Sequence, residues 1–295
     1  MCGIAGQIEL TSDRSTSSRD GVWSMLSSMP WRGPDARGVW SEGPVSLGHL
    51  RLSIIDLSSE ANQPMIDELG NVVIFNGEIY NYRELRSELS SGYTFKTHSD
   101  TEVILAAYAK WGADCVRRFN GEWAFAIYDK TKNSLFVSRD RFGIKPLYYT
   151  IKDNILYFAS EIRALLAAGI PAEMSIHKLA EFLKFRQIEQ RYQTHFENIF
   201  PVEPGKNLFI DLDTGQLDEE YYYGPSDLFS ADVPKDEDDA LDMFGSLLQD
   251  SVRLRMHADV PVQVLLSGGL DSSAIGAFAV GSAKTEVKTL SSVFP

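Results

Sequence analysis

The feature that most constrains the fold is a group of short strand-like runs within residues 1–160, separated by helical segments that do not alternate regularly with them. The runs are rich in β-branched and aromatic residues, and several alternate apolar and polar positions. They are Gly3–Leu10, Val45–Ile55, Val72–Phe75, Trp123–Tyr128, Leu135–Ser138 and Ile155–Ala159. Strands grouped in this way indicate an antiparallel α+β layer fold rather than a doubly wound sheet.

Two helices are predicted between these runs. The segment Glu78–Leu89 places apolar residues on one helical face, namely Ile79, Tyr82, Leu85 and Leu89. Ser99 and Glu102 have the spacing of a capping box, which predicts that a helix begins there.

The pattern changes after residue 200. A hairpin-like stretch and a polar segment lead to a predicted helix, Glu237–Met256, with a mostly apolar stripe. A buried-type strand, a Gly-rich turn, a helix from Ser272 and a second strand follow, which is the start of a βαβ unit. The strands are Val262–Leu266 and Val287–Phe294. We therefore expect a first domain over 2–215, a linker over 216–236 and a second domain over 237–295.

Composition excludes several classes of partner. The net charge of -13 disfavours nucleic acid and anionic lipid surfaces. No stretch approaches the roughly 20 apolar residues that span a bilayer, and the N-terminus does not resemble a secretory signal. The two cysteines, Cys2 and Cys115, are too few for a disulfide framework. A cytoplasmic location is expected.

Cys2 is the leading candidate for a nucleophile. Removal of Met1 would leave a thiol and a free α-amine on the same residue, and an α-amine has a pKa of about 7.7–8.0. Near neutral pH such an amine can accept the thiol proton, so no histidine is required. The alternative is that Cys2 is a small buried hydrophobic residue.

Further motifs occur in a fixed order along residues 1–168. They are Met1-Cys2-Gly3-Ile4-Ala5-Gly6, Trp31-Arg32-Gly33-Pro34-Asp35, Gly48–Asp56, Asn76-Gly77-Glu78-Ile79-Tyr80-Asn81, Ser99-Asp100-Thr101-Glu102, Arg139–Tyr149 and Phe158-Ala159-Ser160-Glu161. Together they resemble the class II glutamine amidotransferases, whose N-terminal-nucleophile fold is an αββα antiparallel sandwich. The resemblance implies that the chain hydrolyses glutamine.

The resemblance also implies roles for the matched residues. Arg51 would bind the α-carboxylate of glutamine through its guanidinium fork. Glu78 and Asp100 would bind the α-ammonium, and backbone groups around Leu52 and Ile54 would line the pocket. Asn76 and the N–H of Gly77 would stabilise the oxyanion that forms when the Cys2 thiolate attacks the amide carbon.

Each assignment has a structural alternative. Asn76-Gly77 could be a hairpin turn, Arg51 a surface residue, and Asp100 a residue favoured by a helix dipole. Arg32 and Asp35 either form an ion pair in a turn or border the glutamine pocket, and we favour the second. We expect structural roles for the remaining residues, with His49 and Cys115 inert and with Asp140 and Arg141 ordering a loop.

A second motif follows the strand that ends near Leu265. Ser267-Gly268-Gly269-Leu270-Asp271-Ser272 matches the PP-loop of ATP pyrophosphatases. Two glycines and a helix start direct N–H groups toward phosphate oxygens, and the serine hydroxyls add donors. We expect these positions, with Leu265, to bind ATP, and Asp271 to hold Mg²⁺ through the pyrophosphate. The alternative is a plain Gly-rich strand-to-helix turn.

A class II glutaminase followed by a PP-loop resembles glutamine-hydrolysing asparagine synthase. That resemblance implies ATP, Mg²⁺, glutamine and aspartate as reactants, no tightly bound cofactor, and ammonia passing through a tunnel to an adenylated aspartate. A homodimer is compatible with the sequence, which does not fix the oligomeric state. Because a complete synthetase domain would extend beyond Pro295, we expect a fragment limited to glutamine hydrolysis. Two other readings stay open: an amidotransferase acting on a different carboxylate, and a non-catalytic glutamine-binding module.

Overall fold

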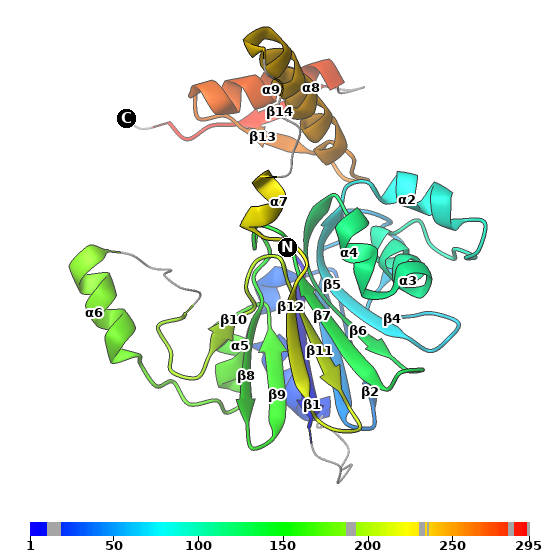
Figure 1. The fold of residues 1–295 in the computed structure, drawn as a ribbon, viewed down its shortest axis with the longest axis vertical. Coiled ribbons are helices and arrows are strands. Elements are labelled where there is room, and N and C mark those ends of the chain that lie inside the picture. The colour runs from blue at the N-terminus through cyan, green and yellow to red at the C-terminus, as the bar shows by residue number, and fades with distance from the viewer. Residues whose placement is uncertain (11–18, 187–192, 230–233, 235, 283–285, 294–295) are drawn as a thin grey trace. The chain divides into compact units, whose positions relative to one another are not determined.

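The computed structural model describes residues 1–10, 19–186, 193–229, 234, 236–282 and 286–293. The chain forms two compact units, and most of their elements are labelled in Figure 1. The first unit comprises Met1–Ser53 and Ser58–Gly224, and the second comprises Ile54–Leu57 and Pro225–Pro295.

The first unit contains an antiparallel sheet with strand order β10-β8-β9-β1-β3-β2. The strands are β1 (Gly3–Glu9), β2 (Ala36–Glu42), β3 (Val45–Arg51), β8 (Tyr148–Lys152), β9 (Ile155–Ala159) and β10 (Phe200–Pro201). β1 lies between β3 and β9, with Gly3 opposite Leu50 and Ala5 opposite Ala159. The chain therefore enters this sheet at a central strand, directly after Cys2.

A second antiparallel sheet has the order β12-β11-β7-β6-β5-β4. Its strands are β4 (Met65–Ile66), β5 (Val72–Ile79), β6 (Gly121–Asp129), β7 (Ser134–Arg139), β11 (Lys206–Asp211) and β12 (Leu217–Tyr221). β6 is buried along most of its length, as expected for a central strand of a covered sheet.

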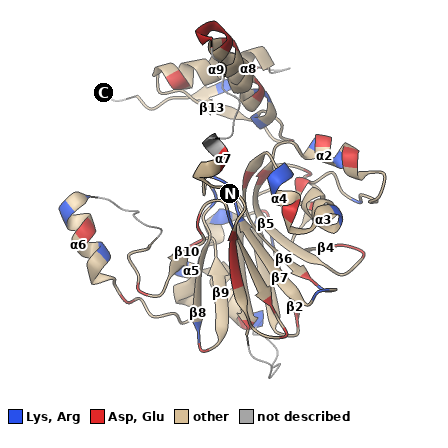
Figure 2. Ribbon diagram, in the orientation of Figure 1, with Lys and Arg blue, Asp and Glu red and all other residues tan. Residues whose placement is uncertain are grey.

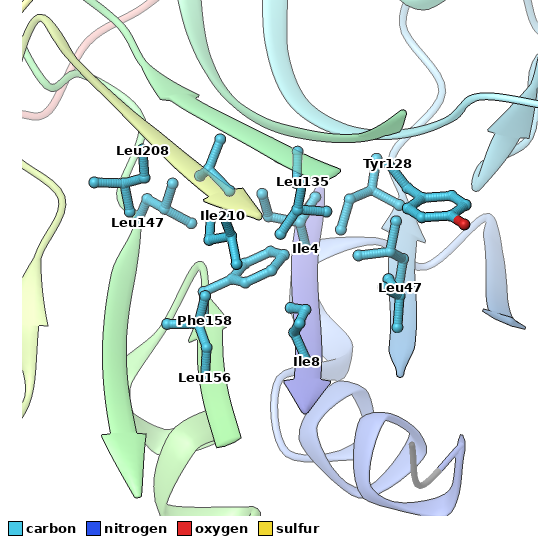
Figure 3. Close-up of a cluster of buried hydrophobic side chains, with 14 of the residues drawn as sticks. Ile4, Ile8, Leu47, Tyr128, Leu135, Leu147, Leu156, Phe158, Leu208 and Ile210 are labelled. Atoms are coloured by element: carbon cyan, nitrogen blue, oxygen red, sulfur yellow. The ribbon is translucent and has the colours of Figure 1, made fainter. Parts of the chain in front are cut away.

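The two sheets pack face to face around one apolar core. Side chains from both sheets point into this core, as Figure 3 shows. Among them are Ile4, Ile8, Leu47, Leu135, Phe158, Leu208 and Ile210. Since side chains alternate between the faces of a strand, the opposite faces remain for the helices.

Helices cover the outer faces. α1 (Arg19–Ser27) and α5 (Ile162–Ala167) pack on the first sheet and bury a second apolar cluster. α3 (Asp100–Trp111) lies on the second sheet, where Tyr108 stacks on Phe136 and donates a 3.0 Å hydrogen bond to Asp129. The predicted antiparallel α+β sandwich is confirmed.

Further helices complete the first unit. They are α2 (Tyr82–Leu89), α4 (Cys115–Arg118), α6 (Ile176–Phe185) and the 3-10 turns Pro30–Arg32, Ser59–Ala61 and Gly112–Asp114. Within the described ranges, no helix has the length and apolar character needed to cross a bilayer.

Two helix predictions need correction. The helix predicted over Glu78–Leu89 begins only at Tyr82, because Glu78 and Ile79 continue β5 and pair with β6. Ser99 does cap α3, accepting a 3.1 Å bond from the N–H of Thr101. Glu102 does not complete a capping box, because its carboxylate accepts the N–H groups of Lys96 and Thr97 instead.

The predicted boundary at residue 215 also needs correction. It falls within the β11–β12 hairpin, where Leu208 pairs with Glu219, so the first unit continues to Gly224. Figure 2 shows β12 as a strongly acidic strand. The pairing of β11 with β12 confirms the hairpin-like stretch predicted after residue 200, and this pairing holds the polar β12 as a strand.

The second unit contains α7 (Pro225–Phe229), α8 (Glu237–Arg255), β13 (Gln263–Leu265), α9 (Leu270–Ser282) and β14 (Lys288–Leu290). β13 and β14 are parallel, with Val264 opposite Thr289, so the predicted βαβ connection is confirmed. α8 begins where Asp236 accepts the N–H of Asp238 at 3.0 Å. Acidic residues fill its first turn, which complements the helix dipole (Figure 2).

Candidate active site

Cys2 directly precedes the central strand β1. Its Sγ accepts a hydrogen bond of 3.3 Å from the backbone N–H of Leu52, the residue after β3. Its carbonyl oxygen accepts a 2.8 Å bond from Nε of Arg32. The side chain is partly buried. The thiol is thus held against the chain that leaves β3.

The surroundings of Cys2 act on its ionisation in opposite directions. Burial raises the pKa of the thiol, and the charges of Glu78 and Asp100 add to this, while the N–H of Leu52 and the amino terminus lower it. The structure contains Met1, so the amino terminus is the Met1 amine, whose pKa burial lowers. A lowered pKa leaves more of an amine unprotonated near neutral pH, where it can accept a proton.

Asn76 lies within β5, opposite Ala124 of β6, so the alternative of a hairpin turn is wrong. Its side chain is buried, and Nδ2 has no hydrogen-bond partner in the described part of the chain. An unsatisfied buried donor costs about 1–3 kcal/mol. Such a donor is suited to a ligand oxygen that arrives during a reaction.

The backbone N–H of Gly77 points away from β6. Its cross-strand partner Trp123 directs both its own N–H and its carbonyl to Asp140, on the opposite side of β6. Gly77 and Trp123 are therefore a non-hydrogen-bonded pair. A Cβ at position 77 would lie 2.2 Å from the carbonyl oxygen of Glu122, so only glycine fits here.

His49 connects the two strands that carry these groups. Its Nε2 lies 3.0 Å from the carbonyl oxygen of Phe75, which joins β3 to β5. Burial lowers the pKa of His49 to about 3, so the ring is neutral at physiological pH. This contact between the sheets is structural, as predicted.

Arg51 is the last residue of β3 and is 5% exposed, which excludes a snorkelling surface residue. Its Nη1 donates to the carbonyl oxygen of Ser58 at 2.7 Å and to Oδ1 of Asn62 at 2.9 Å. These bonds fix the guanidinium near the end of the strand next to Cys2. Contact with a substrate carboxylate remains a prediction.

Glu78 and Asp100 form a pair of carboxyl groups near the thiol. Asp100 is the first residue of α3, and its Oδ2 accepts the N–H of Ile79 at 3.0 Å, which brings it to β5. Burial raises the pKa of both groups, and the charge of Asp100 raises that of Glu78 further. A bound ammonium ion would offset this repulsion, which suits the pair to recognise an amine.

Lys145 completes this region and was not singled out from the sequence. Its Nζ lies 2.7 Å from Oε1 of Glu122, which is the cross-strand partner of Glu78. Two glutamates directly opposite each other repel, and the lysine compensates for this. The sequence motif that contains Lys145 did not predict this ion pair, because only the register of β5 and β6 places Glu122 opposite Glu78.

The two predicted pocket-lining residues are assigned to different units. Leu52 belongs to the first unit and contacts the thiol, whereas Ile54 belongs to the second unit. There the carbonyl oxygen of Ile54 accepts the N–H of Asp259 at 2.9 Å. A role for Ile54 in glutamine binding remains a prediction.

Other candidates have structural contacts. The Asp140 carboxylate accepts backbone N–H groups of its own loop, including those of Phe142 and Lys145 at 3.0 and 2.9 Å. Arg141 donates to the carbonyl oxygen of Phe119 at 2.7 Å, and Cys115 is fully buried, with its pKa raised by burial. These observations agree with the predicted structural roles.

Arg32 and Asp35 do not form the ion pair that was one alternative. Arg32 pairs with Glu161 at 3.2 Å, and its Nη2 has no partner within the described ranges. Asp35 accepts the N–H of Ser53 at 2.7 Å. That Arg32 and Asp35 border a glutamine pocket remains a prediction.

The predicted PP-loop connects β13 to α9 in the second unit. Gly268 has a φ of +82°, a conformation that glycine adopts without strain. The hydroxyls of Ser267 and Ser272 lie 3.0 Å apart, and Ser272 also donates to the carbonyl oxygen of Gly269 at 3.1 Å. Asp271 is in the first turn of α9. The turn thus places two glycines and two serine hydroxyls at a helix start, with the N–H of Gly269 donating to Oγ of Ser267 at 3.4 Å.

Asp271 supplies a single carboxylate for a metal ion. Within the described residues, no group of three or more His, Cys, Asp or Glu side chains is arranged to hold a metal. Mg²⁺ usually binds through one or two carboxylates together with substrate phosphates. That Asp271, at the predicted PP-loop, holds Mg²⁺ together with a nucleotide remains a prediction.

Comparison with known families assigns the first unit. Residues 1–223 match the family model of the glutamine amidotransferase domain. The chain belongs to this family. Residues 243–295 match the model of asparagine synthase, so the PP-loop lies in a segment similar to that family.

Curated relatives match most of this amidotransferase chain. The chain is 37% identical over 297 residues to glutamine-hydrolysing asparagine synthetase 3 of Bacillus subtilis, which covers 98% of the chain and 47% of the relative. It is 38% identical over 250 residues to amidase chry2 of Gibberella zeae, which covers 83% of the chain and 36% of the relative. The chain thus spans about half the length of the first relative and less of the second.

Solved structures confirm the fold of the amidotransferase domain. Glutamine phosphoribosylpyrophosphate amidotransferase of B. subtilis superposes with a TM-score of 0.57 at 18% identity, covering 98% of this chain and 65% of that one. At this identity the similarity shows the fold alone.

Proposed function

We propose that the first unit hydrolyses glutamine to glutamate and ammonia with Cys2 as the nucleophile. The observation that carries this proposal is the position of the Cys2 thiol. Its sulfur accepts a hydrogen bond from the N–H of Leu52, and the charges of Glu78 and Asp100 act on its pKa. Cys2 also stands at the start of a domain of the glutamine amidotransferase family.

Substrate recognition follows from the charges near the thiol. Arg51 binds the α-carboxylate of glutamine, for which a planar guanidinium provides two parallel donors. Glu78 and Asp100 bind the α-ammonium. Requiring both charges selects a free amino acid and excludes simple amides.

The reaction begins after Met1 is removed, when the free amine belongs to Cys2. The amine accepts the thiol proton, and the thiolate attacks the side-chain amide carbon of glutamine. Nδ2 of Asn76 and the N–H of Gly77 stabilise the resulting oxyanion. The ammonium of Cys2 then protonates the leaving nitrogen, which departs as ammonia and leaves a thioester. Water, deprotonated by the same amine, attacks the thioester and releases glutamate.

For the second unit we propose ATP binding at the PP-loop, through Leu265, Ser267, Gly268, Gly269, Asp271 and Ser272, with Mg²⁺ held by Asp271 and the phosphates. Together with a whole synthetase domain, the ammonia would aminate a carboxylate activated by ATP, and we propose cytoplasmic aspartate as the acceptor. The name of the B. subtilis relative supports asparagine as the product. The comparable identity to an amidase supports the alternative of a different carboxylate.

The test of the glutaminase proposal is ammonia and glutamate release by the purified chain, by Cys2→Ala and by Cys115→Ala. Intact mass spectrometry first establishes that Met1 is absent. We expect turnover by the wild type and by Cys115→Ala, and none by Cys2→Ala. Equal turnover by all three would overturn the assignment of Cys2. Glutamine binding without turnover by the Met1-free wild type would favour the non-catalytic binding module.

A further inference from the structure

We propose that Glu161 is a positioning residue for the nucleophile, acting through Arg32. This inference rests on the proposed role of Cys2. Glu161 belongs to a sequence motif, Phe158-Ala159-Ser160-Glu161, that the proposed reaction does not use.

The nucleophile is a terminal residue that needs anchoring. The β1 ladder begins at Gly3, so Cys2 itself has no strand partner in the register. Terminal residues are mobile unless they are tied down. The 2.8 Å bond from Nε of Arg32 reaches the Cys2 carbonyl, which is unchanged when Met1 is removed. Arg32 is therefore placed to hold the processed N-terminus.

Arg32 in turn depends on Glu161. Its side chain is 7% exposed, and a buried guanidinium requires a counter-charge. Oε1 of Glu161 supplies it, at 3.2 Å from Nη1. Loss of that carboxylate would leave the cation buried without its ion-pair partner and free the guanidinium to rotate away from Cys2.

Glu161 is itself fixed relative to β1. The preceding residue, Ser160, bonds Ile4 twice: its Oγ accepts the N–H of Ile4 at 3.0 Å, and its own N–H donates to the Ile4 carbonyl at 2.9 Å. Glu161 stands at the N-cap of α5, yet its side chain makes no capping hydrogen bond. Oε1 instead accepts Nε1 of Trp31 at 3.1 Å as well as Arg32. Oε1 of this carboxylate thus binds Trp31 and Arg32 and does not cap the helix.

A second arginine provides a matched control. Nε of Arg163 lies 3.3 Å from Oε2 of Glu161, and the Arg163 side chain is 58% exposed. An exposed ion pair of this kind contributes little to stability. Arg163→Gln removes a partner of the same carboxylate without touching the bond between Arg32 and Cys2.

The first readout is glutamine hydrolysis. We expect Glu161→Ala to lower kcat by about 10- to 100-fold, the effect of a small displacement of a reacting group. KM for glutamine should change little, because Arg51, Glu78 and Asp100 are untouched. Glu161→Gln keeps an acceptor oxygen and should retain an intermediate kcat, and Arg163→Gln should match the wild type.

The second readout does not require turnover. Iodoacetamide labelling, mapped by peptide mass spectrometry, reports the accessibility of Cys2, while the fully buried Cys115 reports unfolding. In Glu161→Ala we expect Cys2 to label several-fold faster than in the wild type, with Cys115 still protected.

Unchanged kcat and unchanged Cys2 labelling in Glu161→Ala would overturn the proposal. So would a raised KM at constant kcat, or labelling of Cys115 in both Glu161 variants, which would show a general structural role. Absence of turnover in the wild type would count against the glutaminase proposal alone, because the labelling comparison still decides the role of Glu161.

Discussion

Replacing Asn76 with alanine should separate catalysis from stability. The side chain is 1% exposed, and its Nδ2 has no partner within the described ranges. Removing this donor relieves a desolvation penalty of about 1–3 kcal/mol. The packing lost with the side chain is of similar size, about 2 kcal/mol if each removed group counts as a buried methylene. The free energy of unfolding should therefore change by less than about 1 kcal/mol.

The effect on the reaction should be much larger. Loss of one oxyanion donor typically lowers kcat by about 10²–10³, which corresponds to about 2.7–4 kcal/mol of transition-state stabilisation. The assay is ammonia release over a range of glutamine concentrations, with urea unfolding of the same preparation.

Asn207→Ala is the matched control for this prediction. Asn207 lies on β11 of the same sheet, is 2% exposed and also carries a buried side-chain atom, Oδ1, without a partner in the described chain. It should show wild-type kcat. A kcat for Asn76→Ala within twofold of the wild type would refute the oxyanion assignment, as would a loss of activity that follows a loss of several kcal/mol of stability.

Three further predictions concern other residues of the candidate site. Gly77→Ala places a Cβ 2.2 Å from the carbonyl oxygen of Glu122 on β6. The midpoint of urea unfolding should therefore fall by the equivalent of about 1–3 kcal/mol. An unchanged midpoint would contradict the close packing. Arg51→Lys keeps the charge but loses the fork, so KM for glutamine should rise at least tenfold, and an unchanged KM would remove Arg51 from the binding site. Because burial raises the pKa of Glu78, the folded protein keeps a proton that the unfolded chain releases above about pH 4.3, and its stability should fall as pH rises. Unfolding measured against pH should show a weaker decline in Glu78→Gln, and equal slopes would contradict the cause given.

The layer architecture followed from the sequence because apolar alternation marks the buried strands of both sheets. The sequence did not predict that β5 continues beyond Phe75, because Asn76 and Gly77 have low strand propensity and resemble a turn. Pairing with β6 and the bond from Ile79 to Asp100 overrode that local preference. Pairing also explains why the predicted linker began too early, at residue 216, because the polar residues of β12 form a strand only through β11.

The site was predictable to the extent that its residues lie in motifs. The sequence could not show that Asn76 Nδ2 lacks a partner, since this depends on the packing around β5. It could not show that Lys145 forms an ion pair with Glu122, the cross-strand partner of Glu78. Nor could it show that Glu161 pairs with Arg32 from the far side of β1. These contacts join residues more than 20 positions apart, and only the folded register specifies them.

The most direct test of the account is covalent trapping of the nucleophile. The purified chain is incubated with a glutamine analogue that carries a diazoketone in place of the side-chain amide, and the N-terminal peptide is sequenced by mass spectrometry. The account predicts a single adduct on the sulfur of Cys2, in a peptide that lacks Met1 and has a free amine, with protection by excess glutamine. A retained Met1 on the labelled peptide, or labelling that occurs elsewhere and spares Cys2, would contradict it.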